Sequence, residues 1–310
     1  RSVAALNSIT TSRPMSDSAA VEATMKKVRH LEIRAKKLVT ETFAGDYYSS
    51  FKGQGLDFNE FREYQHGDDV RFLDWNVTAR TGTPYIRTFR EERELSMVIA
   101  VDVSGSTHFG SRDLSKIELA AELAAVLGFS AHKNGDKTGL LLFASEPVLY
   151  LPPAKGSKQI LRSIREILTS KPHTPTTNLP AACKFLVRSV RRRALVFLIS
   201  DFMDTDLGQP LATLAHKHET IALHLSDPLE KELPAVGKVN FRGSETGHLT
   251  MVNTSNSNVR MAYMKLSRRY REGMRRQFRR YGIDHVSLST TENYLPSLQH
   301  LLKTRAPAAS

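Results

Sequence analysis

The sequence has a single cysteine and no long apolar run. With only Cys183 among 310 residues, an intrachain disulfide and a cysteine-rich zinc site are both excluded. A reducing compartment fits such a chain, so we expect a cytoplasmic protein. No apolar run approaches the ~20 residues that a membrane-spanning helix needs. The sequence therefore predicts a chain without a membrane span.

Motifs for nucleotide binding and for nucleophilic hydrolysis are also lacking. The tripeptide Gly156-Ser157-Lys158 does not have the spacing of a phosphate-binding P-loop. Neither Ser104 nor Ser106, the serines of the most informative turn, stands in a G-x-S-x-G context. Nucleotide hydrolysis would therefore have to come from a partner, and serine-hydrolase chemistry is unsupported.

Acidic residues are fewer than basic ones. The chain has 32 Asp+Glu against 44 Lys+Arg, a formal net charge of +12, which favours acidic partners without identifying one. With 40% hydrophobic residues, the composition is ordinary for a globular protein. The length suffices for one large domain or two small ones with a sizeable core.

From residue 95 onward, apolar strands alternate with amphipathic helices. We expect strands at 95–103, 138–143, 194–201, 220–226 and 285–289, with a short hairpin partner at 148–151. Helices are expected at 115–133, 157–168, 179–192, 207–218, 259–281 and 295–303. Such alternation indicates parallel pairing with helices on both faces. The predicted fold class is α/β, a doubly wound, mostly parallel, Rossmann-like sheet with an N-terminal helical and hairpin extension.

The region before residue 95 has a different pattern. Charged and apolar positions alternate at helical spacing over residues 21–42, which predicts a basic amphipathic helix. Residues 53–94 are polar, dense in opposite charges and broken by glycines and Pro84, which favours short, hairpin-like pieces. A surface-packed extension tied by ion pairs that contribute little each is the favoured interpretation of that segment.

These patterns divide the chain into four parts. The chain begins with Arg1, which we interpret as an upstream extension or a cloning remnant, with Met15 as a candidate native start. The expected parts are a disordered N-terminal segment at 1–25, a charged helix and hairpin extension at 26–94, an α/β domain at 95–303 and a disordered tail at 304–310.

An oxygen-rich turn follows the first strand of the α/β domain. Asp102-Val103-Ser104-Gly105-Ser106 leaves the apolar run at residues 97–101. Ligands of open α/β sheets bind in the crevice outside the carboxyl ends of the strands. One carboxylate and two hydroxyls, without nitrogen or sulfur, are suited to Mg²⁺ or a similar hard cation. The turn therefore predicts a metal site.

Two further loops are expected to reach the same rim. The loop at residues 172–179 carries Thr174, Thr176 and Thr177, and Ser200-Asp201 ends the strand at 194–201. A lone Asp-x-Ser is usually an ordinary turn, but the ordered set of carboxylates and hydroxyls favours a functional site. Carboxylates that hold ligand waters would leave the ion able to take an acidic side chain from another protein.

These motifs resemble those of a known family. Residues 102–106 with Thr177 and Asp201 resemble the metal-ion-dependent adhesion site (MIDAS) of von Willebrand factor type A domains. Further segments look like the signature of the domain-of-unknown-function 58 family (DUF58), of the MoxR-associated type: residues 53–58, 62–64, 67–71, 74–75, 78–80, 109–110, 136–139, 199–202, 227–228 and 232–234. The likeness covers nearly all of residues 26–303.

The resemblance implies a von Willebrand factor type A-like fold and a set of metal ligands. The implied ligands are Asp102, Ser104, Ser106, Thr177 and Asp201. The serines and the threonine would touch the metal, and the aspartates would act directly or through water. Thr176 stands beside Thr177, so the choice between the two threonines stays open. The resemblance implies Mg²⁺, with Mn²⁺ or Ca²⁺ as alternatives.

The family also implies a partner. Its members are similar to proteins encoded beside MoxR-type AAA+ ATPases and are thought to act with them in chaperone-like maturation of other proteins. We therefore expect a non-catalytic protein–protein interaction module, an adaptor or co-chaperone of such an ATPase. Charged and aromatic residues of the signature are candidate partner contacts: Arg62, Asp68, Asp69, Arg71, Trp75 and Arg80.

Two rival functions remain open. In a Mg²⁺-dependent hydrolase, Asp102 and Asp201 would position the metal, and a base would have to activate water, with His108 the nearest in sequence. In a nucleic-acid-binding protein, the basic face of the helix at 259–281 would contact phosphates. A basic helix face is more often simply solvated, so we do not expect nucleic acid as a partner.

Overall fold

A six-stranded sheet forms the centre of the computed structural model, which describes residues 17–51, 56–91, 95–112, 114–171, 176–203, 208–242 and 248–305. The strand order is β10-β7-β6-β3-β4-β5, and every neighbouring pair is parallel except β4 with β5. The strands are β3 (Ser96–Asp102), β4 (Lys137–Phe143), β5 (Pro147–Ala154), β6 (Leu195–Ser200), β7 (Glu219–Ser226) and β10 (Asp284–Ser289). The predicted doubly wound, mostly parallel α/β fold is confirmed.

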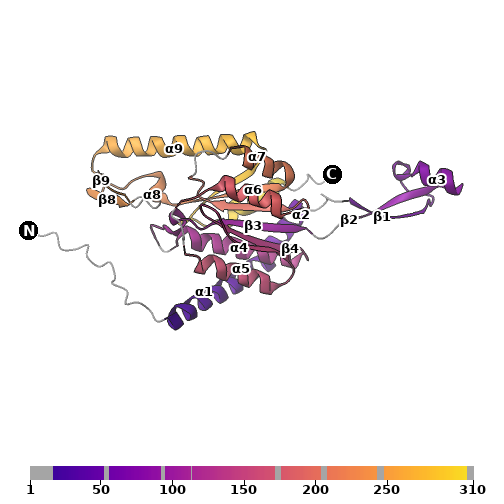
Figure 1. Cartoon of the computed structure of the whole chain (residues 1–310), viewed down its shortest axis with the longest axis horizontal. Helices are drawn as coiled ribbons and strands as arrows, with labels where there is room; N and C mark the ends of the chain where they lie inside the picture. The colour runs from indigo at the N-terminus through magenta and orange to yellow at the C-terminus, as the bar shows by residue number, and fades with distance from the viewer. Residues whose placement is uncertain are drawn as a thin grey trace, which may run out of the picture.

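Helices cover both faces of this sheet (Figure 1). One face packs against α1 (Asp17–Leu38), α2 (Ala44–Phe51), α4 (Lys116–Lys133), α5 (Ser157–Thr169) and α10 (Leu295–Arg305). The other packs against α6 (Leu179–Ser189), α7 (Gly208–Lys217) and α9 (Ser257–Arg280). Because alternate strand residues point to opposite faces, Ile99 and Val101 join the first cluster, while Val98 and Ala100 join the second.

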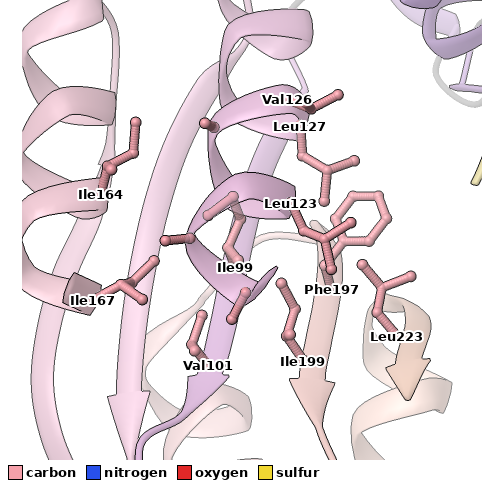
Figure 2. Packing of buried hydrophobic residues seen from close by; sticks show 14 of the residues in the cluster. Ile99, Val101, Leu123, Val126, Leu127, Ile164, Ile167, Phe197, Ile199 and Leu223 are labelled. Atoms are coloured by element: carbon pink, nitrogen blue, oxygen red, sulfur yellow. The ribbon is translucent and has the colours of Figure 1, made fainter. Parts of the chain in front are cut away.

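Helix α4 fills the middle of the first face. Its Leu123 and Leu127 lie beside Phe197 of β6, and Ile164 and Ile167 of α5 point into the same cluster (Figure 2). The helix begins with a capping box, in which the Ser115 side chain accepts from the Glu118 N–H and the Glu118 carboxylate accepts from the Ser115 N–H. This cap fixes the first turn of α4 at the carboxyl-terminal edge of the sheet.

The predicted N-terminal helix is confirmed, but it begins and ends four residues earlier than expected. Helix α1 begins at Asp17, so the expected boundary of disorder at residue 25 is wrong, and residues 1–16 lie outside the described part of the chain. A π-helical turn (Val39–Phe43) joins α1 to α2. Lys27 and Arg34 of α1 form ion pairs with Glu118 and Glu122 of α4, which hold α1 against the domain.

The predicted hairpin precedes β3. Strands β1 (Leu56–Glu63) and β2 (Tyr85–Glu91) pair antiparallel, and α3 (Trp75–Thr81) lies between them. Asp74 caps α3 by accepting from the N–H groups of Asn76 and Val77, and it forms an ion pair with Arg87. The hairpin lies beyond the amino-terminal end of β3, on the opposite side from the carboxyl-terminal edge of the sheet (Figure 1).

Between β7 and α9 the sequence predicted only irregular chain. The structure adds helix α8 (Pro228–Lys231) and an antiparallel hairpin of β8 (Lys238–Arg242) and β9 (Leu249–Asn253). These strands lack a buried apolar face, with Leu249 and Met251 both exposed, and each is only five residues long, so their short alternating patterns gave a weak signal. The last described residue is Arg305, and most of the expected tail at 304–310 lies beyond it. None of the helices in the described ranges is long and apolar enough to span a membrane.

Candidate metal site at the carboxyl end of the sheet

The predicted oxygen ligands lie at a topological switch point. Asp102 ends β3, and Asp201 follows β6, the strand that pairs with β3. From β3 the chain passes to β4 on one side of the sheet, whereas β6 lies on the other side. Such a reversal of strand order opens the crevice in which α/β proteins bind ligands.

The carboxylate of Asp102 is the centre of a buried hydrogen-bond cluster. Its Oδ1 accepts from the Ser104 N–H at 2.9 Å. Its Oδ2 accepts from the Ser200 hydroxyl at 2.7 Å and from the Thr177 hydroxyl at 3.2 Å. The structure therefore brings the turn after β3, the threonine loop and the end of β6 together, as predicted. The contact of Ser200 was not predicted.

The two serines of the turn face each other. The Oγ atoms of Ser104 and Ser106 are 3.2 Å apart, and both side chains are buried. The hydroxyl of Thr107 donates to the Ser104 carbonyl at 2.8 Å, which holds the turn. Adjacent oxygens around an octahedral Mg²⁺ with bonds of about 2.0–2.1 Å lie roughly 3 Å apart. The spacing of the serine hydroxyls fits two such neighbouring positions.

Of the three candidate threonines, Thr177 is the one whose hydroxyl reaches Asp102. Thr176 is exposed, and Thr174 lies outside the described residues. Asn178 caps α6 directly after the loop and donates its N–H to the Ala144 carbonyl at 2.8 Å, which fixes the end of this loop. The sequence left the choice between Thr176 and Thr177 open because neighbouring residues in a loop have no predictable direction.

Phe202 turns the chain immediately after Asp201. Its φ of 51° is the one positive φ of a non-glycine residue in the described ranges. Its ring is buried and packs edge-on against Phe278 of α9, and its N–H donates to the Ser200 hydroxyl at 2.9 Å. Strained backbone of this kind clusters at functional sites, where the surrounding packing holds it.

Lys116 is a member of the site that the sequence did not reveal. It is completely buried in the first turn of α4, and its ammonium donates to Asp201 Oδ2 at 2.7 Å and to the Glu230 carboxylate of α8. Asp201 and Glu230 therefore share one ammonium, and the carboxylate of Asp102 lies close enough to Asp201 to be affected by its charge. The cluster thus has an excess of negative charge that a divalent cation would neutralise. The one sequence signal was a lysine in a first helical turn, where the helix dipole disfavours a cation.

The pKa values reflect this imbalance of charge. Burial, and then the nearby Asp201 carboxylate, raise the pKa of Asp102 to about 6. Burial alone would raise the pKa of Asp201, but the Lys116 ammonium and a hydrogen bond from Ser106 outweigh it and hold this pKa below its usual value. Asp102 is thus the carboxylate whose negative charge the metal-free site tolerates least.

The donor set consists of hydroxyls and few carboxylates. Within the described ranges, no three or more His, Cys, Asp or Glu side chains are grouped so that they could hold a metal ion. A cation at this site would therefore depend on the hydroxyls of Ser104, Ser106 and Thr177 and on water. Mg²⁺, a hard cation that keeps several waters, fits this chemistry.

His108 is poorly placed to act as the base of a hydrolase. Its Nδ1 lies 3.2 Å from the Ser104 carbonyl oxygen, and its Nε2 lies 3.1 Å from the Ser170 carbonyl oxygen. A general base needs a ring nitrogen with a free lone pair directed at water. Because both nitrogens face carbonyl acceptors, the geometry gives the hydrolase hypothesis no support from this residue.

The predicted partner contacts lie on the hairpin, away from the oxygen cluster. Arg62 forms a two-point ion pair with Asp68 at 2.7 and 2.9 Å, and Asp69 pairs with Arg71. The Trp75 side chain is 72% exposed, and Arg80 is exposed as well. The hairpin precedes β3 in the chain, whereas the oxygen cluster lies at the carboxyl end of β3. A strand of seven residues is about 23 Å long, so the two sites are separated by about the length of β3.

Comparisons with known proteins assign the family. A family model described as "Protein of unknown function DUF58" matches residues 60–273. The chain belongs to the DUF58 family. An uncharacterized protein of Mycobacterium tuberculosis is 31% identical over 286 residues, 91% of this chain and 90% of that protein. An uncharacterized protein of Mycobacterium avium is 27% identical over 161 residues, 51% of this DUF58 chain and 95% of the relative.

Solved structures provide likenesses of fold. BatB from Bacteroides thetaiotaomicron is 19% identical, with 68% of this chain and 98% of that chain covered and a TM-score of 0.41. An aerotolerance-related membrane protein from Bacteroides fragilis is 18% identical, with the same coverage and a TM-score of 0.44. The SpRpn10 VWA domain is 12% identical, with 68% and 93% covered and a TM-score of 0.35.

Proposed function

We propose that this DUF58 protein is a non-catalytic, cytoplasmic adaptor whose Mg²⁺ ion binds an acidic side chain of a protein partner. The observation that carries the proposal is the pair of buried hydroxyls of Ser104 and Ser106, 3.2 Å apart, beside the carboxylate of Asp102. A buried pair of hydroxyls next to excess negative charge favours a bound divalent cation over a purely structural turn.

The proposed ligands combine neutral and charged oxygens. Ser104, Ser106 and Thr177 would contact the ion, and Asp102 and Asp201 would hold it directly or through water. Mn²⁺ and Ca²⁺ are alternatives with the same preference for oxygen. If the aspartates hold the ion through water, the ligands in direct contact are neutral hydroxyls, and a vacant coordination position can then take a carboxylate from outside.

We further propose a MoxR-type AAA+ ATPase as the partner. The support is the family assignment together with the lack of a P-loop, because ATP-driven work would then depend on a second protein. In this arrangement the adaptor presents the ATPase or its client with a metal-bound docking position and performs no bond-breaking step itself.

The double substitution Ser104→Ala and Ser106→Ala tests this proposal. We expect the variant to fold, because each change removes one hydroxyl, and to lose at least tenfold in affinity for a purified MoxR-type ATPase in a Mg²⁺-dependent binding assay. The matched control is Ser130→Ala with Ser163→Ala, which removes two buried hydroxyls that bond only to helix carbonyls. Equal binding by both double variants, or binding by the wild type that survives chelation, would count against the proposal.

We propose the tip of the hairpin as a second contact with the same partner, through Arg62, Asp68, Asp69, Arg71, Trp75 and Arg80. Interface hot spots are enriched in tryptophan and arginine, and truncating one costs about 2 kcal/mol or more. Trp75→Ala should therefore weaken binding to the ATPase roughly 30-fold and leave Mg²⁺ affinity unchanged. Trp75 is the only tryptophan, so its fluorescence should shift to the blue when it is buried. An unshifted spectrum at saturation would remove Trp75 from the interface.

A further inference from the structure

Helices α1 and α5 are neighbours in the helical layer (Figure 1). An open, mainly apolar groove runs between them. We call it the α1–α5 groove. It has a volume of about 810 Å³. Its lining comes from two helices alone: Glu22, Met25, Lys26, Val28, Arg29, Glu32, Ile33 and Lys36 of α1, and Lys158, Leu161, Arg162 and Arg165 of α5.

The floor of the α1–α5 groove is apolar and partly uncovered. Val28 and Leu161 pack into it, while Met25 is 55% and Ile33 is 62% exposed. On each helix the lining residues recur at spacings of three and four, so each helix contributes a single face. From Glu22 to Lys36 the face on α1 is about 21 Å long at 1.5 Å per residue. A helix of about four turns from another molecule matches this length.

The rim of the α1–α5 groove is strongly basic. Six cations line it, against only the carboxylates of Glu22 and Glu32. Both carboxylates already form ion pairs within α1, with Lys26 at 2.8 Å and with Lys36 at 2.6 Å.

The other four cations of the rim have no carboxylate partner among the described residues of α1. Arg162 and Arg165 share the single carboxylate of Glu166. Arg29 and Lys158 form no ion pair with any residue in the described ranges. The rim therefore has an excess of positive charge on both sides of an apolar floor.

We propose that the α1–α5 groove is a docking site for an acidic amphipathic helix of a partner protein. The apolar stripe of such a helix would cover Met25 and Ile33, and its flanking Asp or Glu residues would face Arg29, Lys158 and Arg162. Helix-in-groove recognition of this kind relies on apolar anchors at helical spacing. The site needs no metal and shares no residue with the oxygen cluster, so it goes beyond the function proposed above.

Charge disfavours the other occupants. A second copy of this chain has a net charge of +12, which two basic rims would repel. Residues 1–16, which precede α1, contain two arginines and no Asp or Glu, so this segment does not complement the basic rim either. An acidic segment of a different protein complements the rim best.

The test uses the full chain and a fluorescein-labelled synthetic helix of 18 residues, with leucine at every third or fourth position and glutamate elsewhere. Fluorescence anisotropy at low salt should show saturable binding that weakens as salt rises and is unaffected by EDTA. A scrambled peptide of the same composition, without a continuous leucine stripe, should bind at least tenfold more weakly. Equal binding by the scrambled peptide would overturn the proposal.

Charge reversals on the protein locate the site. Arg29→Glu with Arg162→Glu should weaken binding at least tenfold. The control, Arg191→Glu with Arg192→Glu, makes the same change in net charge at exposed positions outside the groove and should have a far smaller effect. Met25→Ser with Ile33→Ser, which keeps the charge, should also weaken binding.

Equal losses in the two charge-reversed proteins would overturn the proposal. So would a dimer that the groove reversal dissociates, or tighter binding after deletion of residues 1–16.

Discussion

Lys116→Met is expected to destabilise the metal-free protein by about 3–5 kcal/mol, because removing one partner of a buried ion pair leaves an uncompensated charge. The Lys116 ammonium is completely buried and holds Asp201 at 2.7 Å together with Glu230. Without it, the buried carboxylate of Asp201 loses its counter-charge beside the half-buried Glu230, and a divalent cation could replace the ammonium. The same substitution should therefore increase the stabilisation that Mg²⁺ provides.

Urea denaturation with and without 10 mM Mg²⁺ measures both effects. The control is Lys217→Met, which removes a half-buried ammonium that donates to the Val187 carbonyl, away from the site. That control should leave the Mg²⁺ response unchanged. Combining Lys116→Met with Asp201→Asn should recover part of the lost stability, since it removes both charges, and should abolish the Mg²⁺ response. If Lys116→Met were as stable as the wild type and gained no more from Mg²⁺, this charge balance would be wrong.

Asp102→Asn is expected to have the opposite effect and stabilise the metal-free protein at pH 7. Burial and the Asp201 carboxylate raise the pKa of Asp102 to about 6 in the folded state, against about 3.9 in an unfolded chain. The folded state therefore binds the proton more tightly. Above about pH 3.9 the unfolded chain ionises Asp102 more readily than the folded protein does, so the wild type loses stability as the pH rises. This loss reaches its full size, roughly 3 kcal/mol, above pH 6, where the folded carboxylate is ionised too.

The pH dependence supplies the internal control for this variant. The stability difference between Asp102→Asn and the wild type should be largest above pH 6. It should shrink as the pH falls and vanish near pH 4, where both folded proteins have a neutral side chain. The variant should also gain nothing from Mg²⁺. A metal-free Asp102→Asn protein that is less stable than the wild type at pH 7 would show that the carboxylate has a structural role.

Much of the fold could be predicted because it follows from local patterns. The buried strands β3 and β6 are continuous apolar runs between amphipathic helices, so their parallel pairing and the convergence of Asp102 with Asp201 could be inferred from the sequence. The hairpin of β8 and β9 was missed because its strands are only five residues long and leave apolar residues such as Leu249 and Met251 exposed.

The electrostatic part of the site depended on long-range contacts. Lys116 meets Asp201 and Glu230 across separations of 85 and 114 residues. No local pattern indicates that a lysine on α4 will be buried against α8. The choice of Thr177 over Thr176 likewise depended on the direction of one hydroxyl toward Asp102. The oxygen donors were therefore predictable as a group, whereas their counter-charge was not.

Calorimetric titration of Mg²⁺ into the metal-free protein at pH 7.5 tests the metal site most directly. We predict saturable heat for one site in the wild type, and none in Ser104→Ala with Ser106→Ala. At a free concentration near 100 times Kd, the ion should add about 2.7 kcal/mol to the free energy of unfolding of the wild type. The absence of heat with both Mg²⁺ and Mn²⁺, or equal heat in the double variant, would contradict the assignment.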